Sequence, residues 1–157
     1  MRLLAAGLAL VPLVAPALQA QKPSTVKADV QAFVRSYADA ANRGDAAAYA
    51  AMYKESADLI VINDGEVKRG WSSIRDEANQ ILGTEGSYKI SAGIVDVLPL
   101  GSTRAVASFP FVLTVQTQAG LAQLKGASTL VLEKTGTKWL IVHDHTSLQQ
   151  PPATQTE

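Results

Sequence analysis

Hydrophobic side chains recur with helical spacing over the first part of the chain. Between Ser24 and Arg43 they fall three and four residues apart, which places them on one face of an amphipathic helix. They are Val26, Val30, Phe33, Val34, Tyr37, Ala40 and Ala41. Gly44 is suited to end this helix, and Asp45 can cap a second, short and alanine-rich helix that carries Tyr49 and Tyr53.

The pattern then changes to strands, with one further helix among them. Two short apolar runs flank Asp64-Gly65, a dipeptide typical of tight hairpin turns. Helical spacing returns from Trp71 to Leu82 and stops at Gly83. Four strand-like runs follow, separated by gaps of turn length. They are "YKISAGIVDVLPL", "RAVASFPFVLTVQTQ", "GLAQLKGASTLVLEK" and "KWLIVHDHTSL". This order predicts an α+β domain with helices on one face of a curled antiparallel sheet.

The composition and net charge of the chain narrow its possible binding partners. The chain has 157 residues, of which 47% are hydrophobic, as in an ordinary single-domain globular protein. Its 14 basic and 14 acidic residues cancel, and the sequence has no run of Lys or Arg. The basic surface of a nucleic-acid-binding protein is therefore not expected. Because the sequence has no Cys, its stability must come from the core without disulfide bonds.

The first twenty residues differ from the rest of the chain. Arg2 precedes an apolar run that ends in small residues, so 1–20 is predicted to be a secretory signal peptide. Pro12 and Pro16 interrupt this run and argue against a membrane anchor. We therefore expect a secreted or periplasmic protein without membrane attachment after cleavage. The domain is predicted to cover 21–148, and the tail 149–157 to be disordered.

The last strand carries both histidines of the chain, His143 and His145. If the final turn is Thr135-Gly136, Ser128 lies opposite His143, and both histidines share one face of the sheet. The same face would carry Leu130, Leu132, Trp139 and Ile141. This register predicts that both imidazoles point into the interior.

The opposite face of these strands is also apolar in its middle, at Val131, Leu140 and Val142. A sheet with two apolar faces needs a cover on both. The helices can cover one face, and a second copy of the chain can cover the other. Alternate side chains of the preceding strand would suit such a homodimer contact, namely Phe109, Phe111, Leu113 and Val115. Burial of both faces within one chain is the alternative.

Three segments resemble a known superfamily: "NRGDAAAYAAMY", "RGWSSI" and above all "GTKWLIVHDHTS". They are similar to the nuclear transport factor 2-like superfamily, in particular its SnoaL-like branch and the association (hub) domain of calcium/calmodulin-dependent protein kinase II. The resemblance covers nearly all of Ser24 to Leu148. It implies a cone-shaped curved antiparallel sheet wrapped around three N-terminal helices, a cystatin-like α+β roll with a deep pocket. It also implies a dimer through the convex side of the sheet.

The resemblance further places His143 and His145 in or near the pocket. It aligns Val112 and Leu130 with cavity arginines of the hub domain, so no cationic clamp for a carboxylate ligand is expected. Related isomerases and cyclases use a pocket aspartate or a tyrosine and acid pair. Asp58 is the candidate acid here, because Asp144 is expected to point away from the histidine face.

Two roles are open for His143. It can act as a general base together with Asp58 or a tyrosine, because imidazole titrates near neutral pH. It can instead be a hydrogen-bonded wall residue tied to Ser128, which we favour because no second catalytic group is evident. The expected pocket wall consists of Tyr37, Tyr53, Trp71, Val112, Ser128, Leu130, Ile141, His143 and His145.

The sequence therefore predicts an exported SnoaL-like protein that binds a small, mostly hydrophobic molecule. No metal site is expected, because two histidines without further ligands do not form one. No cofactor is expected either, since no Gly-rich phosphate loop is present. A cofactor-free isomerase, cyclase or hydrolase that uses His143 is the first alternative. A homo-oligomeric assembly module is the second.

Overall fold

The structure is a computed structural model that describes residues 22–82, 88–118 and 120–149. The predicted signal peptide, 1–20, and the predicted tail, except Gln149, lie outside the described residues. The helices are α1 (Pro23–Asn42), α2 (Ala46–Ala50) and α3 (Trp71–Leu82). The strands are β1 (Ile60–Asn63), β2 (Glu66–Arg69), β3 (Tyr88–Ala92), β4 (Asp96–Pro99), β5 (Arg104–Thr117), β6 (Gly120–Thr135) and β7 (Lys138–Leu148).

The junction between the first two helices follows from its sequence. Gly44 adopts a φ of 69°, a left-handed conformation that costs glycine little and ends α1. The side chain of Asp45 then accepts a hydrogen bond of 2.9 Å from the backbone N–H of Ala48 and caps α2. The predicted cap residues are confirmed, and they bring α1 and α2 together with almost no linker.

The strands form one curved sheet in the order β2-β1-β7-β6-β5-β3, with β4 also paired to β5. All pairs are antiparallel except β1 with β7, which run parallel. The predicted α+β cone is confirmed, with a mixed sheet in place of a fully antiparallel one. A parallel pair requires a long connection, and β2, α3 and β3 to β6 lie between β1 and β7 in the chain.

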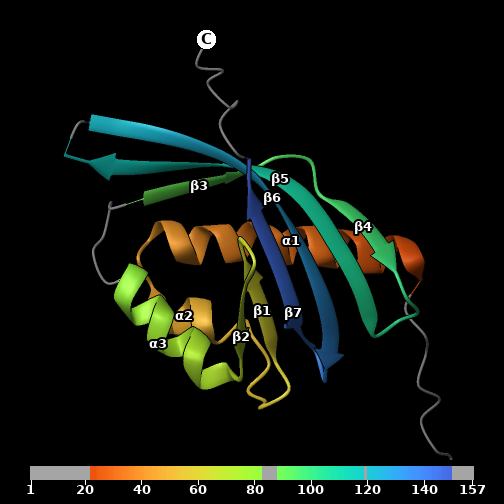
Figure 1. The fold of residues 1–157 in the computed structure, drawn as a ribbon. Helices are drawn as coiled ribbons and strands as arrows, with labels where there is room; N and C mark the ends of the chain where they lie inside the picture. The colour runs from red at the N-terminus through yellow and green to blue at the C-terminus, as the bar shows by residue number, and fades with distance from the viewer. Residues whose placement is uncertain (1–21, 83–87, 119, 150–157) are drawn as a thin grey trace, which may run out of the picture.

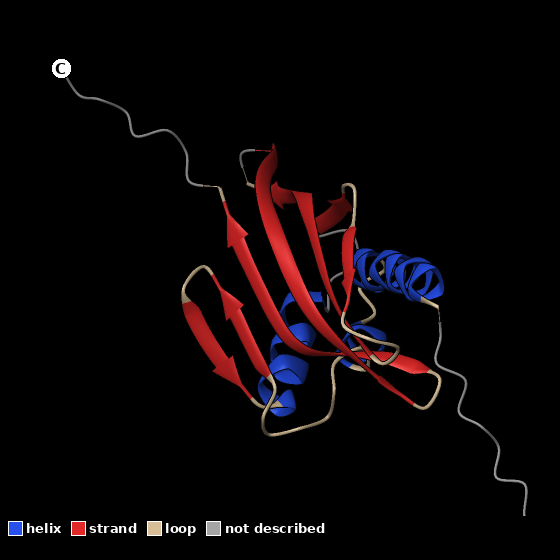
Figure 2. Ribbon diagram, turned by 90° about the vertical axis from the view of Figure 1, so that its right-hand side faces the viewer, coloured by secondary structure: helices blue, strands red, loops and turns tan. Residues whose placement is uncertain are grey.

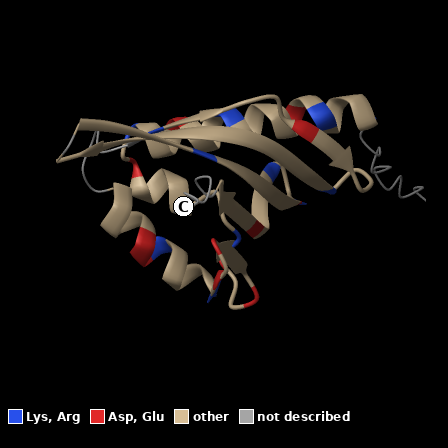
Figure 3. Cartoon of the chain, turned by 45° about the horizontal axis from the view of Figure 1, so that its top comes forward, with Lys and Arg blue, Asp and Glu red and all other residues tan. Residues whose placement is uncertain are grey.

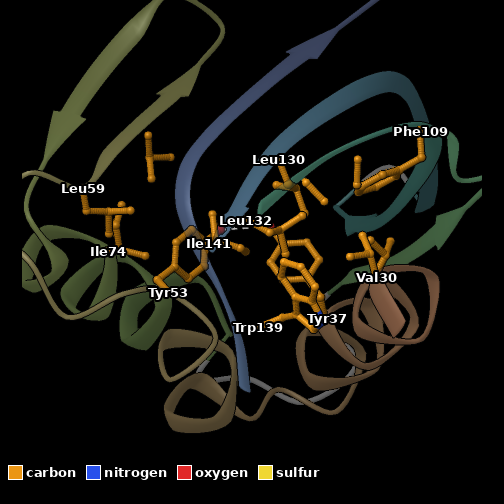
Figure 4. Packing of buried hydrophobic residues seen from close by; sticks show 14 of the residues in the cluster. Val30, Tyr37, Tyr53, Leu59, Ile74, Phe109, Leu130, Leu132, Trp139 and Ile141 are labelled. Carbon is orange, nitrogen blue, oxygen red and sulfur yellow. Dashed lines mark hydrogen bonds between the residues drawn. The ribbon is translucent and has the colours of Figure 1, made fainter. Parts of the chain in front are cut away.

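The helices lie on the concave side of this sheet (Figures 1 and 2). Helix α1 contacts β3, β4 and β5, and α2 contacts α3. Side chains from both layers meet in one core, which includes Val30 of α1 and Leu130 and Leu132 of β6 (Figure 4). Charged residues of both signs are intermixed over the helices and strands, without a large region of one sign (Figure 3).

The final hairpin turns one residue later than the sequence predicts. Thr135 pairs with Lys138, so the two turn residues are Gly136, at a φ of 60°, and Thr137. Gly at the first turn position is typical of tight hairpins. The predicted turn at Thr135-Gly136 is therefore wrong. Trp139 and Ile141 keep their predicted inward direction, because the register moves by two residues.

A β-bulge at Val142 then reverses the direction of every later side chain in β7. Leu132 pairs with Ile141, but Val131 pairs with His143, so Val142 is an extra residue. One extra residue moves the following side chains to the opposite face. Asp144 consequently faces the interior. His143 and His145 face outward, contrary to the prediction.

On the side away from β6, β7 pairs with two different segments, and the bulge lies where the first segment gives way to the second. The segment after α2 pairs with β7 at Ile141, through Lys54 N–H to Ile141 O (2.8 Å) and Ile141 N–H to Met52 O (2.9 Å). From His143 onward, β1 takes over as the partner. Val142 separates the two pairings, and the first of them anchors Tyr53 beside β7.

Gly126 of β6 lies in close contact with Phe111 and with the backbone carbonyl of Ser147. A Cβ atom at this position would lie 2.5 Å from that carbonyl oxygen. We therefore expect Gly126→Ala to lower the free energy of unfolding by about 1–3 kcal/mol, as overpacking does. Chemical denaturation measures this loss. The exposed neighbour Lys125 provides the control, because Lys125→Ala is expected to change stability by less than about 0.5 kcal/mol. Equal effects of the two changes would contradict the packing described here.

Candidate functional site

A cavity of about 390 Å³ lies between the three helices and the concave face of the sheet. This volume falls within the range of small-molecule sites in proteins. Most of its wall is apolar, formed by Val61, Ile74, Ile90, Phe109, Phe111, Leu113 and Val115 among others. The polar groups gather at one end, around a single carboxylate. The cavity can therefore hold a mostly apolar molecule and form hydrogen bonds with one polar group of that molecule.

That carboxylate belongs to Asp144, whose exposed fraction is 2%. Its Oδ2 accepts hydrogen bonds from the hydroxyls of Tyr53 (2.8 Å) and Tyr37 (3.4 Å). Its Oδ1 accepts from Ser128 (3.3 Å) and Thr146 (3.2 Å). The described residues that line the cavity include no Lys, Arg or His. Asp144 is thus held by neutral donors and has no cationic partner in the cavity wall.

Tyr37, Tyr49 and Tyr53 come from α1, α2 and the segment after α2, and their hydroxyls meet at one point. The oxygen–oxygen distances are 2.6 Å for Tyr37–Tyr49, 3.0 Å for Tyr37–Tyr53 and 3.1 Å for Tyr49–Tyr53. With the two contacts to Asp144, three hydroxyl hydrogens serve at least five contacts. Each hydroxyl donates only one hydrogen. The cluster is therefore short of protons when Asp144 is ionised, and a proton on Asp144 supplies one more.

Burial controls the ionisation of this cluster. Loss of solvent raises the pKa of Asp144, and the hydrogen bonds from Tyr53, Thr146, Ser128 and Tyr37 offset only part of that rise. Burial also raises the pKa of Tyr37 and of Tyr53 well above its ordinary value, and the nearby Asp144 adds to both shifts. The two tyrosines consequently remain neutral donors while Asp144 can gain or lose a proton.

The structure places three of the predicted wall residues in the cavity lining. Tyr37, Tyr53 and Ser128 line it, as predicted. Leu130 and Ile141 are fully buried in the core and lie outside the lining.

Trp71 and Val112 were also predicted in the wall and are not among the lining residues. The indole N–H of Trp71 donates to the carbonyl oxygen of Ala50 at 2.9 Å, and its ring packs against the core. Val112 lies on the opposite face of β5, in a groove on the outside of the sheet. Alternation along β5 explains this, because Phe111 and Leu113 face the cavity.

The predicted pair of His143 and Asp58 is not assembled. His143 is half-buried on the outer face of β7, and His145 is exposed there. Neither lines the cavity, and the prediction that they do is wrong because of the bulge at Val142. Asp58 is exposed in the turn before β1. Ser128, the expected partner of His143, binds Asp144 instead.

Three members of the site, Asp144, Tyr49 and Thr146, were not predicted from the sequence. An acid inside an otherwise apolar strand is one available signal for Asp144, because a buried carboxylate is costly and is kept for a reason. Tyr49 and Tyr53 are four residues apart, the spacing at which side chains meet on one helical face. The direction of Asp144 depends on the bulge, which has no sequence signature here.

Two further properties concern the described part of the chain. No group of three or more His, Cys, Asp or Glu residues in it is arranged to hold a metal ion. Within the same residues, no helix combines the length and the apolar character needed to cross a membrane.

Comparison with known proteins agrees with this architecture. The sequence profile of the SnoaL-like domain matches residues 30–151, which is most of the chain. The protein therefore belongs to the SnoaL-like domain family. A search of curated proteins finds no match.

Solved structures share the fold at low sequence identity. A nuclear transport factor 2-like superfamily protein from Salmonella enterica is 20% identical with a TM-score of 0.73, over 87% of this chain and 99% of that one. A candidate dehydratase of the same family from Streptomyces avermitilis is 17% identical with a TM-score of 0.74, over 83% and 100%. A candidate calcium/calmodulin-dependent protein kinase II association domain from Xanthomonas campestris is 23% identical with a TM-score of 0.66, over 80% and 87%. These likenesses establish the fold.

The raised pKa of Asp144 predicts a pH dependence of stability. An unfolded aspartate titrates near about pH 4, so above this pH the folded protein binds the proton that the unfolded chain releases. The contribution of Asp144 to the free energy of unfolding is therefore fully present below about pH 4 and is lost as pH rises through the raised pKa. Asp144→Asn removes this dependence.

Chemical denaturation of both proteins from pH 4 to pH 8 measures this effect. We expect the wild type to lose stability relative to the Asp144→Asn variant as pH rises, because all other titrating groups are common to both. A difference that stays constant over this range, or one that changes in favour of the wild type, would contradict the assignment.

Proposed function

We propose that the cavity binds a small, mostly apolar molecule and catalyses a proton-transfer reaction on it without a cofactor, most simply a dehydration. The observation that carries this proposal is the buried carboxylate of Asp144, held by hydroxyl donors at the polar end of the cavity. Support also comes from the fold, since neighbours from Streptomyces avermitilis and Novosphingobium aromaticivorans are named as candidate dehydratases.

The first step requires a base. In its ionised form, Asp144 accepts a proton from a carbon atom next to a carbonyl or similar activating group of the ligand. A raised pKa makes the carboxylate a stronger base than an ordinary aspartate at neutral pH. The apolar wall limits competing water, which strengthens the interaction between the base and the ligand.

The second step requires an acid. As the carbon–carbon double bond forms and the carbon–oxygen bond breaks, the leaving hydroxide takes a proton from Tyr49 and departs as water. Tyr49 suits this role because it lines the cavity, and its hydroxyl lies 2.6 Å from that of Tyr37 and 3.1 Å from that of Tyr53, so it can be reprotonated through the cluster.

The hydroxyl cluster then restores the starting state. Asp144 returns its proton to Tyr53 across 2.8 Å, and Tyr53 passes its own proton to Tyr49 across 3.1 Å. The net reaction leaves Asp144 ionised and all three tyrosines neutral. No external proton donor, oxidant or cofactor is needed for this balance.

Proton abstraction can be tested without the natural substrate. We expect the wild-type protein to accelerate the exchange of the α-hydrogens of 2-tetralone in deuterium oxide, followed by proton NMR. Asp144→Asn should lower the exchange rate by roughly 100-fold, within the range of general base catalysis. Ser108→Ala is the matched control, because it removes a 3.1 Å hydroxyl contact with Thr129, outside the cavity lining, and should leave the rate unchanged.

Two results would overturn this assignment. Loss of exchange in His143→Ala, with an unchanged melting temperature, would show that His143 is required for proton abstraction, contrary to the role given to Asp144. Binding of 2-tetralone without any exchange, seen as a rise in melting temperature, would leave a ligand-binding protein and remove the catalysis.

The homodimer and the export of the chain also remain proposals. The dimer contact predicted for Phe109, Phe111, Leu113 and Val115 is wrong, because these side chains line the cavity. The outer face of the sheet instead presents Val106, Val112, Val131 and Leu140, all half-buried in the single chain, and this apolar character favours a second copy as its cover. Light scattering of the purified protein tests the dimer, and a monomer at high concentration would exclude it.

Mass determination of the N-terminus after expression with export machinery tests the signal peptide.

A further inference from the structure

Apart from the tyrosines, the ionisable groups among the described lining residues are all acids. They are Asp64, Glu77 and Asp144. Glu77 is offset by Lys68, whose Nζ lies 2.7 Å from Glu77 Oε1 and which is not among the lining residues. Asp64 accepts a 2.7 Å hydrogen bond from the backbone N–H of Leu148, and no cation among the described residues pairs with it. None of the described lining residues supplies a positive charge to offset Asp64 or Asp144.

Burial shows which end of the cavity is closed. On β5, Phe109 and Phe111 are buried, and Leu113 further along is only half-buried. On β7, exposure likewise increases from the buried Asp144 to Leu148. A ligand consequently enters past Leu113 and Leu148, and its leading group comes to rest against Asp144 and the tyrosine hydroxyls.

A ligand that leads with an anionic group binds unfavourably at this closed end, whether Asp144 is ionised or protonated. If Asp144 is ionised, two negative charges meet in a poorly solvated space, where repulsion at about 6 Å amounts to roughly a 100-fold loss of affinity. If Asp144 is protonated, the ligand brings a charge into the interior without any cation to pair with it, which is also costly. An uncharged leading group avoids both costs, because a hydroxyl group can donate to ionised Asp144 and a carbonyl group can accept from the cluster when Asp144 carries the additional proton.

We propose that this cavity selects its ligand by charge: it accepts uncharged molecules that lead with a hydroxyl or carbonyl group, and it rejects molecules that lead with a carboxylate or phosphate. This inference rests on the proposed function of the cavity as a ligand site. It deepens that function by defining the substrate class.

Calorimetric titration at pH 7.5 with two matched probes tests the proposal. The probes are 2-naphthol, which is uncharged, and 2-naphthoate, which has the same rings and an anionic group. We expect 2-naphthol to bind and 2-naphthoate to bind roughly 100-fold more weakly. Asp144→Asn should reduce that gap, mainly by raising the affinity for 2-naphthoate. Ser108→Ala, outside the cavity lining, should leave both affinities unchanged.

A second variant keeps the test valid if Asp144→Asn fails to fold. Asp64→Asn removes a charge near the entrance, and Asn tolerates the left-handed conformation of this residue, whose φ is 49°. It should raise the affinity for 2-naphthoate several-fold, because the charge lies farther from the bound ligand.

The outcomes separate the two proposals. Equal affinities of the wild type for both probes would overturn the charge selection and leave the binding function intact. A persistent preference for 2-naphthol that neither variant changes would also overturn it, since the acids would not be the cause. Failure of 2-naphthol and of uncharged naphthalene to bind would instead count against the binding function itself.

Discussion

The burial of one carboxylate determines the arrangement of this molecule. Asp144 retains only 2% of its exposure, and an isolated charge at such a position would be strongly unfavourable. Hydroxyls from α1, from the segment after α2, from β6 and from β7 itself converge on it. The helices and the sheet must therefore hold one fixed relation to each other, and the cavity beside the carboxylate is a consequence of that relation.

The burial of Asp144 depends on the β-bulge in β7, which also decides which ionisable side chain enters the site. The bulge at Val142 separates the pairing of β7 with the Tyr53 segment from its pairing with β1. Without the extra residue, Asp144 would face outward and the histidine beside it would face the hydroxyls. A single position in the backbone thus decides whether the interior holds an acid of raised pKa or an imidazole.

Much of the fold could be predicted from the sequence, because hydrophobic spacing and cap residues are local signals. The helix junction at Gly44 and Asp45 and the order of helices before strands are of this kind. The direction of Asp144 could not be predicted, because it depends on a register shift created by two different neighbours of β7 that are far away in the sequence. Tyr37 and Tyr53 were predicted as wall residues because the sequence pattern places them on inner helical faces, although α2 ends before Tyr53. Asp144 was predicted to face outward because strict strand alternation was assumed.

Direct titration of the Asp144 carboxyl tests this account best. Carbon NMR of the side-chain carboxyl, assigned with the Asp144→Asn variant, reports its pKa without any ligand or substrate. The account predicts a midpoint above the ordinary aspartate value of about 3.9, because desolvation outweighs the hydrogen bonds. A midpoint at or below that value would contradict it, since the carboxyl would then be either open to water or stabilised mainly as the anion.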